Sequence, residues 1–163
     1  MVFSRKHLGE KVSIFEFSNK LGHVEKRQIV HVYYLLRELL DSGVNPDDIM
    51  VLARFNKNLF DLKQYCGAKN IPIHEKFGGI RFYSAHKSKG SEANYVILID
   101  IISGMYGFPC EISDSSVLEI AKRNVNANHF EEERRLFYVA LTRSKNYLYI
   151  YTRENENSIF IKR

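Results

Sequence analysis

The sequence lacks the patterns that mark several large classes of protein. Cysteine occurs only twice in 163 residues, and Cys66 and Cys110 are too few for a disulfide scaffold and match no metal-binding spacing. No apolar run is long enough to cross a bilayer, and the polar start over residues 1–6 is not typical of a signal peptide. These absences predict a reduced, cytoplasmic protein without a membrane segment.

Charge is not concentrated in any tract either. The chain has 24 Lys and Arg against 19 Asp and Glu, a net charge of +5, and these residues are scattered as on a solvated surface. A mild basic excess is only a weak indication of nucleic-acid binding. With 45% hydrophobic residues and no repeats, low-complexity tract or linker, the sequence predicts one domain over residues 1–163.

Two kinds of ligand site are also missing. The phosphate-cradling pattern G-x-x-x-x-G-K-[ST] does not occur, so this part of an ATP site is not expected in the chain. The histidines outside the segments described below show no ligand spacing, and no metal site is predicted. They are His7, His23, His31, His74 and His129.

The apolar residues follow strand and helix periods in alternation. Strand patterns cover residues 12–17, 49–53, 80–84, 95–101 and 147–152, with an edge strand at 71–74. Helix patterns cover residues 29–40, 56–66 and 131–144, with a shorter helix near 117–121. Gly43 is expected to end the first helix, Asn56 to cap the second and Gly67 to end it. Strands separated by helices predict a parallel α/β sheet covered on both faces.

The first segment with candidate chemistry is Ser84-Ala-His-Lys-Ser-Lys-Gly-Ser-Glu92, between two expected strands. Ligands of open α/β sheets bind beyond the carboxyl ends of strands. Gly90 allows a close approach of backbone to a phosphate, and Lys87 and Lys89 supply positive charge. The alternative interpretation is a lysine-rich surface turn.

The second segment is Glu131-Glu-Glu-Arg-Arg-Leu-Phe-Tyr-Val-Ala-Leu-Thr-Arg-Ser-Lys145. Its apolar residues mark the buried face of a helix, and Glu131 and Arg135 stand at the spacing of an ion pair within a helix. A surface helix accounts for these features. It does not account for Thr142-Arg143 at the helix end, directly before a strand.

Together the two segments resemble motifs V (T-x-H-x-x-K-G-x-E) and VI (E-E-R-R-L-x-Y-V-A-x-T-R) of UvrD/Rep-type superfamily 1 helicases. The resemblance covers residues 49–152 and implies the second RecA-like domain of such a motor, a three-layer α/β domain with a mainly parallel sheet. It also implies ATP with Mg²⁺ as cofactor, the metal being held by a separate, P-loop-bearing first RecA-like domain. Single-stranded DNA is the other implied partner.

The resemblance assigns a nucleotide-binding role to four residues. Lys89 and Gly90 correspond to positions near the phosphates, and Glu92 to the position that reaches the ribose. Arg143 corresponds to the arginine finger that projects onto the γ-phosphate, and it is the expected catalytic residue. Such a finger neutralises charge that develops during phosphoryl transfer.

A second group is implied to contact nucleic acid. Val51-Leu-Ala-Arg-Phe-Asn56 resembles the family's L-x-R-x-N segment, in which Arg54 and Asn56 would contact the DNA backbone. Ser84 and His86 correspond to positions between the DNA and the nucleotide. The alternative for Arg54 is an ordinary surface residue, and for Asn56 a helix cap.

Two further positions lie near the end of the resemblance. Ser158-Ile-Phe-Ile161 is similar to S-R-F-[IL], whose Phe stacks on a base, although Phe160 is equally consistent with a core position. Cys110 follows Gly107-Phe-Pro, where some relatives place a DNA-contacting histidine. A catalytic role for the Cys110 thiol has no supporting context.

The spacing of the motifs indicates a branch of the family. His86 lies 32 positions after Arg54, so the large accessory domain of UvrD and Rep cannot fit between them, and the helicase IV-like branch is nearer. Two hypotheses remain: a helicase motor domain, or a stand-alone binding module that reuses the fold. In either case one functional edge is expected to gather the candidate residues Arg54, Asn56, His86, Lys89, Glu92 and Arg143.

Overall fold

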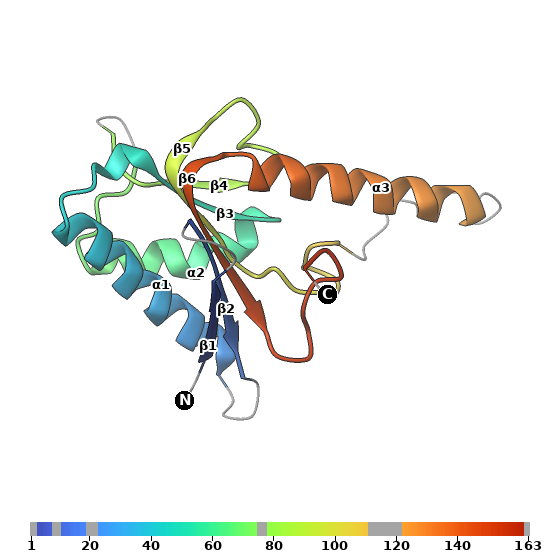
Figure 1. Cartoon of the computed structure of the whole chain (residues 1–163), viewed down its shortest axis with the longest axis horizontal. Coiled ribbons are helices and arrows are strands. Elements are labelled where there is room, and N and C mark those ends of the chain that lie inside the picture. Colours follow the sequence, from blue (N-terminus) through green and yellow to red (C-terminus); the bar gives the residue numbers. More distant parts are fainter. Residues whose placement is uncertain (1–2, 8–10, 19–22, 75–77, 111–121, 162–163) are drawn as a thin grey trace.

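A six-stranded sheet forms the centre of the molecule (Figure 1). The structure is a computed structural model, and it describes residues 3–7, 11–18, 23–74, 78–110 and 122–161. The strand order is β1-β2-β6-β5-β3-β4, with β1 antiparallel to β2 and every other pair of neighbours parallel. The strands are β1 (Phe3–His7), β2 (Val12–Phe17), β3 (Ile49–Ala53), β4 (Arg81–Ser84), β5 (Ala93–Leu98) and β6 (Ser144–Arg153).

Helices cover both faces of this sheet. α1 (Val24–Asp41) and α2 (Asn56–Ala68) pack on one face, and α3 (Lys122–Leu141) packs on the other, with its amino-terminal end extending beyond the sheet (Figure 1). A short 3-10 helix, η2 (Pro46–Asp48), leads into β3. None of the described helices is both long enough and apolar enough to cross a membrane. The predicted three-layer α/β fold with a mainly parallel sheet is therefore confirmed.

Burial in the strands follows the sequence patterns that predicted them. Residues of β2 alternate between half-buried and buried, so that Phe15 and Phe17 point into the core under α1. All five residues of β3 are buried, because helices cover this strand on both faces. The continuous apolar run at 49–53 is thus explained by its central place in the sheet.

Gly43 ends α1 as predicted. It follows the C-cap Ser42 with φ of +87°, in the left-handed region that glycine enters without strain. The N–H of Gly43 donates to the carbonyl of Leu40, and the N–H of Val44 donates to that of Leu39. These two bonds satisfy carbonyls that the helix end would otherwise leave unpaired.

Other predicted boundaries were wrong. Asn56 is the first residue of α2 rather than its cap, since Phe55 occupies the N-cap position with no side-chain bond, and the helix continues one residue beyond Gly67. The predicted strand 71–74 is reduced to an isolated bridge between Ile73 and Ile80. α3 begins nine positions before the predicted start at 131, and β1 was not predicted. The short helix expected near 117–121 lies outside the described residues.

The parallel strands define two ends of the sheet. We call the end near Arg54 and Ser84, where β3 and β4 finish, the carboxyl edge. The end near Glu92 and Arg143, where β5 and β6 begin, is the amino edge. The edges are separated by the length of β5, roughly 20 Å at about 3.3 Å per residue. Residues 85–92 leave the carboxyl edge and return the chain to the amino edge across the α3 face.

Candidate nucleotide and nucleic-acid sites

Arg143 lies at the amino edge, where α3 passes into β6. Its guanidinium donates from Nε to the carbonyl of Val139 (2.9 Å), from Nη2 to the hydroxyl of Thr142 (3.1 Å) and from Nη1 to the carbonyl of Ser91 (3.4 Å). The carbonyl of Arg143 accepts the N–H of Ala93 at 3.0 Å. The end of the second motif is therefore bonded directly to the end of the first.

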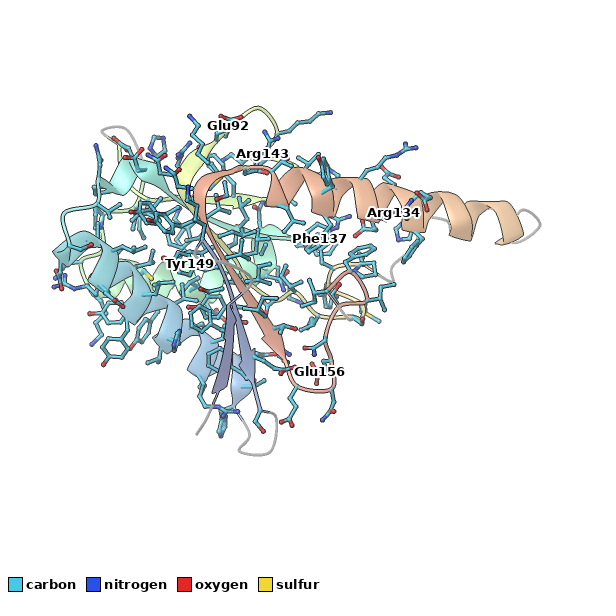
Figure 2. The ribbon with its side chains drawn as sticks, in the orientation of Figure 1. Glu92, Arg134, Phe137, Arg143, Tyr149 and Glu156 are labelled. Atoms are coloured by element: carbon cyan, nitrogen blue, oxygen red, sulfur yellow. The ribbon has the colours of Figure 1, made fainter. Side chains whose placement is uncertain are left out.

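Glu92 lies beside this arginine on the same edge. Figure 2 shows Glu92 and Arg143 at one end of the molecule and Glu156, which follows β6, at the other. The Glu92 side chain is exposed and its carboxylate lies 3.4 Å from Nζ of Lys145. Its carbonyl accepts a 3.0 Å bond from Arg81 at the start of β4. The amino edge thus combines an arginine, a lysine and a carboxylate that are open to solvent.

The turn before Glu92 contains the two other predicted nucleotide residues. Lys89 and Gly90 are both exposed, and Gly90 has φ of +83°, which favours glycine. No atom lies within 4 Å of the position that a Cβ would occupy there, so a larger residue would be disfavoured by backbone conformation and not by crowding. The described residues contain no group of three or more His, Cys, Asp or Glu that could hold a metal ion.

At the carboxyl edge, Arg54 forms a buried ion pair with Glu133 of α3. Nε lies 3.0 Å from both carboxylate oxygens and Nη2 lies 2.6 Å from Oε1, while the two side chains are 10% and 2% exposed. The guanidinium also lies 4.4 Å from the ring centroid of Phe55. Arg54 was predicted as a DNA contact, with a surface residue as the alternative. In the structure, its Nε and Nη2 donate to the buried carboxylate of Glu133.

Glu133 was missed by the sequence reasoning, although a signal for it exists. Glu133, Phe137 and Ala140 are spaced by four and three residues, so the glutamate stands on the apolar face of α3 and must find a buried partner. Besides Arg54, it accepts the N–H of Cys110 at 2.9 Å. The expected Glu131 pair is also different, since its partner is Arg134 at 2.5 Å rather than Arg135.

A hollow of about 460 Å³ opens beside this ion pair. It collects four of the predicted nucleic-acid residues and three others: Arg54, Phe55, Asn56, Ser84, His86, Cys110 and His129. Asn56 and His86 are exposed, and the imidazole of His129 lies 2.8 Å from the carbonyl of Cys110. Cys110 itself is buried, with its thiol 3.3 Å from the carbonyl of Met105.

Phe160 lies away from this hollow, in the packing under α3. Its ring stacks on Phe137 at a centroid distance of 5.3 Å and an interplanar angle of 23°, and it tilts against Phe130. Phe160 remains half-buried. The structure therefore places this residue at the margin of the core, which was the alternative to a base-stacking role.

The expectation of a single functional edge was wrong. Glu92 and Arg143 lie at the amino edge, and Arg54, Asn56 and Ser84 lie at the carboxyl edge. The cause is the strand direction: β4 and β5 run parallel, so the segment that follows β4 must recross the sheet before β5 begins. The candidate residues therefore form two sites joined by one connecting segment.

Residues 75–155, which contain both motifs, match the family of UvrD-like helicase C-terminal domains. The chain belongs to this family. Its sequence is 39% identical over 122 residues to DNA helicase IV of Escherichia coli K12, covering 74% of this chain and 17% of that protein. It is 32% identical over 134 residues to the "Probable DNA helicase II homolog" of Mycoplasma capricolum, covering 82% of this chain and 17% of that protein.

This UvrD-like C-terminal domain thus spans less than a fifth of the length of these two curated relatives. A solved structure agrees with its fold: the C-terminal domain of a possible DNA helicase from Lactobacillus plantarum WCFS1. The two superpose with a TM-score of 0.55 at 13% identity, covering 94% of this chain and 78% of that one. At this identity the likeness concerns the fold alone.

Proposed function

We propose that this UvrD-like domain is the second motor domain of an ATP-dependent DNA helicase. In this proposal it supplies the arginine finger, a ribose contact and part of the path of single-stranded DNA. A first, P-loop-bearing RecA-like domain supplies the phosphate cradle and holds Mg²⁺. The domain does not hydrolyse ATP by itself.

The observation that carries the proposal is the meeting of Arg143 and Glu92 at the amino edge. They come from motifs about fifty residues apart, and the backbone bond from Ala93 to Arg143 fixes their separation. Arg143 donates to the carbonyls of Val139 and Ser91 and to the hydroxyl of Thr142, and all three acceptors are uncharged oxygens. Its positive charge is therefore not neutralised by these partners and can act on a phosphate.

The chemistry of this edge fits one side of a nucleotide. Arg143 and Lys89 are cationic groups suited to phosphate oxygens, and the exposed carboxylate of Glu92 is an acceptor suited to ribose hydroxyls. Bound ATP would supply the phosphoryl group that reacts with water. In the proposed role, Arg143 stabilises negative charge on that group, and Glu92 orients the sugar.

The carboxyl edge is the proposed path of single-stranded DNA. Asn56, Ser84 and His86 line the hollow there and offer hydrogen-bonding groups to a phosphate backbone. Arg54 already uses Nε and Nη2 for Glu133, so a direct phosphate contact falls to Nη1. We therefore assign Arg54 mainly to holding Phe55 and Asn56 in place. Phe160 would contribute a base contact only by leaving the rings of Phe130 and Phe137.

The test is Arg143→Ala in the longer protein that carries this domain. Because the guanidinium acts chiefly in the transition state, ATP turnover should fall by roughly 10³-fold or more while ATP affinity changes little. Arg134→Ala is the matched control, since Arg134 is an exposed arginine of α3, the helix that precedes Arg143, and turnover of this variant should stay normal. Near-normal turnover of the Arg143 variant would remove the finger from the proposal.

A further inference from the structure

An aromatic residue outside the motif assignments lies exposed at the carboxyl edge. Tyr106, in the loop between β5 and α3, is 45% exposed, and Met105 beside it is 60% exposed. Nζ of Lys57, the second residue of α2, lies 4.2 Å from the centroid of the Tyr106 ring. A positive charge thus lies over a partly exposed aromatic ring.

Tyr106 is continuous with the hollow that holds the nucleic-acid candidates. Its ring meets Phe55 edge-on, with centroids 6.3 Å apart and an interplanar angle of 83°. Phe55 in turn lines the hollow and lies under the guanidinium of Arg54. A nucleic-acid strand in the hollow would reach Tyr106 by continuing past Phe55, whose ring centroid is 6.3 Å from that of Tyr106.

A buried polar cluster fixes the position of this tyrosine. Asp100 follows β5 in a left-handed conformation, φ +52°, and accepts bonds from Gln28 of α1, Asn58 of α2 and Arg153 of β6 at 3.0, 3.1 and 3.0 Å. The amide of Asn58 also lies 3.5 Å from the carbonyl of Tyr106. This long contact joins the backbone of the loop to α2, the helix that carries Lys57.

We propose that Tyr106 stacks on a nucleobase of single-stranded DNA while Lys57 contacts the adjacent phosphate. The inference rests on the proposed DNA path at the carboxyl edge and adds to it a base-stacking residue. Stacking on an aromatic ring is tolerant of sequence because every base has a flat face. The contact would bind DNA without selecting a base.

The surroundings favour nucleic acid over a protein partner. A second lysine on this edge repeats the arrangement, with Nζ of Lys87 4.6 Å from the ring centroid of Tyr83. Cationic groups placed beside aromatic rings match the alternation of phosphates and bases along a strand. Among the acidic residues on this side of the fold, Asp100 is engaged by its three donors and Glu133 by Arg54, whereas Asp61 lies exposed in the hollow that Tyr106 and Lys57 line.

The experiment uses the 163-residue chain, which contains no tryptophan. Tyr106→Trp introduces the chain's single tryptophan, which can still stack and whose emission can be excited apart from that of the tyrosines. Its emission should be quenched by an oligothymidylate and unchanged by an abasic oligonucleotide of the same length. Tyr34→Trp is the matched control, because Tyr34 is 64% exposed on α1, and its emission should respond to neither strand.

Affinities complete the test. The unaltered chain should bind oligothymidylate more tightly than the abasic strand, and Tyr106→Ala should weaken oligothymidylate binding about five- to tenfold with little effect on the abasic strand. Lys57→Ala should weaken both strands and lower the salt dependence. An unchanged ratio of the two affinities in Tyr106→Ala would overturn the stacking role, as would the absence of binding to either strand. Neither result bears on the Arg143 finger, which is tested by turnover.

Discussion

At the amino edge Arg143 is held by backbone and hydroxyl oxygens, whereas at the carboxyl edge Arg54 is held by a buried carboxylate. Arg143 keeps its net positive charge and part of its surface. Arg54 has its charge balanced by Glu133, and both side chains are almost fully removed from water. Arg54 follows β3 and Arg143 precedes β6 of the same sheet. Of the two, Arg143 is the one whose positive charge is not balanced by the partners described above.

This difference fits two uses of arginine: the proposed action on a ligand at the amino edge, and the joining of a helix to the sheet at the carboxyl edge. A charge that acts on a ligand must be oriented without being neutralised, and neutral oxygens achieve this. A charge that joins a helix to a sheet must be neutralised, because an unpaired buried ion is costly. Removal of Arg143 should therefore affect activity, and removal of the Arg54 partner should affect stability.

The largest expected effect concerns the chain alone. Purified without its proposed partner domain, it should show no ATP hydrolysis, because the phosphate loop and the Mg²⁺-binding acid required for phosphoryl transfer are to come from that partner. Adding the P-loop domain separately should restore at most weak activity. The measurement is a DNA-stimulated ATPase assay, and robust turnover by the pure chain would contradict the proposed division of the site.

Breaking the carboxyl-edge pair should have the next largest effect. Glu133→Ala leaves Arg54 buried without its carboxylate and should lower the free energy of unfolding by about 3–5 kcal/mol. Urea denaturation followed by circular dichroism measures this change. Glu132→Ala is the neighbouring control, since Glu132 is exposed, and it should change stability by less than about 0.5 kcal/mol.

Removing the arginine of the amino edge should, in contrast, have little effect on stability. Arg143→Ala should leave the free energy of unfolding within about 1 kcal/mol of the original value, since the residue is only half-buried. If Glu133→Ala proved as stable as Glu132→Ala, the carboxyl-edge pair would not be an anchor. That result would contradict the assignment of Arg54 to stability and of Arg143 to activity.

Cys66 of α2 lies in the hydrophobic core and belongs to neither candidate site. Its side chain is 0% exposed, and burial raises the pKa of its thiol from 9.0 to about 12. Above pH 9 the unfolded chain loses the thiol proton while the folded chain keeps it, so stability is full below pH 9 and falls as the pH rises toward 12. The loss should reach up to about 4 kcal/mol.

Urea denaturation between pH 8.5 and 11 measures this loss. Lysines and tyrosines also titrate in that range, so the chain must be compared with Cys66→Ala, which should show a shallower decline of stability. Parallel declines in the two proteins would mean that the thiol does not titrate differently on folding.

The smallest expected effect is at Glu92. Its ion pair with Lys145 is exposed on both sides, 53% and 57%, so Glu92→Ala should cost less than about 1 kcal/mol of stability. In the longer protein the same change should weaken nucleotide affinity roughly tenfold with little change in kcat, since a ribose contact is equally strong before and during the reaction. A large loss of kcat would instead assign Glu92 to the chemical step.

Local patterns predicted most of the fold. Alternation at 12–17, the continuous apolar run at 49–53 and the glycine at 43 each describe a short stretch, and each was confirmed. The capping role of Asn56 was wrong because Phe55, one residue earlier, already has the extended backbone of the N-cap position. β1 was missed because it is a strand only through its antiparallel pairing with β2, and the five residues of β1 show no local pattern that predicts this pairing.

The sites were predicted less completely for a related reason. The motifs supplied candidate residues, whose roles stay predictions, but they gave no sign of the ion pair of Arg54 with Glu133, which joins residues 79 positions apart. The division into two edges depends on the direction of β4 relative to β5, which periodicity does not reveal. The position of Glu133 on the apolar face of α3 was a local sign that this carboxylate has a buried partner far away in the sequence.

The segment 85–92 connects the two edges in only eight residues, and it is firmly held. Ser88 is fully buried and its hydroxyl donates to the carbonyl of Ala85 at 2.7 Å, while its N–H donates to Ser84 and its carbonyl accepts from Ser91. These bonds lie within the segment that joins His86 at one end to Glu92 at the other. If a ligand that moves His86 thereby changes the affinity of Glu92 for a second ligand, the second ligand must change the affinity of the first by the same factor.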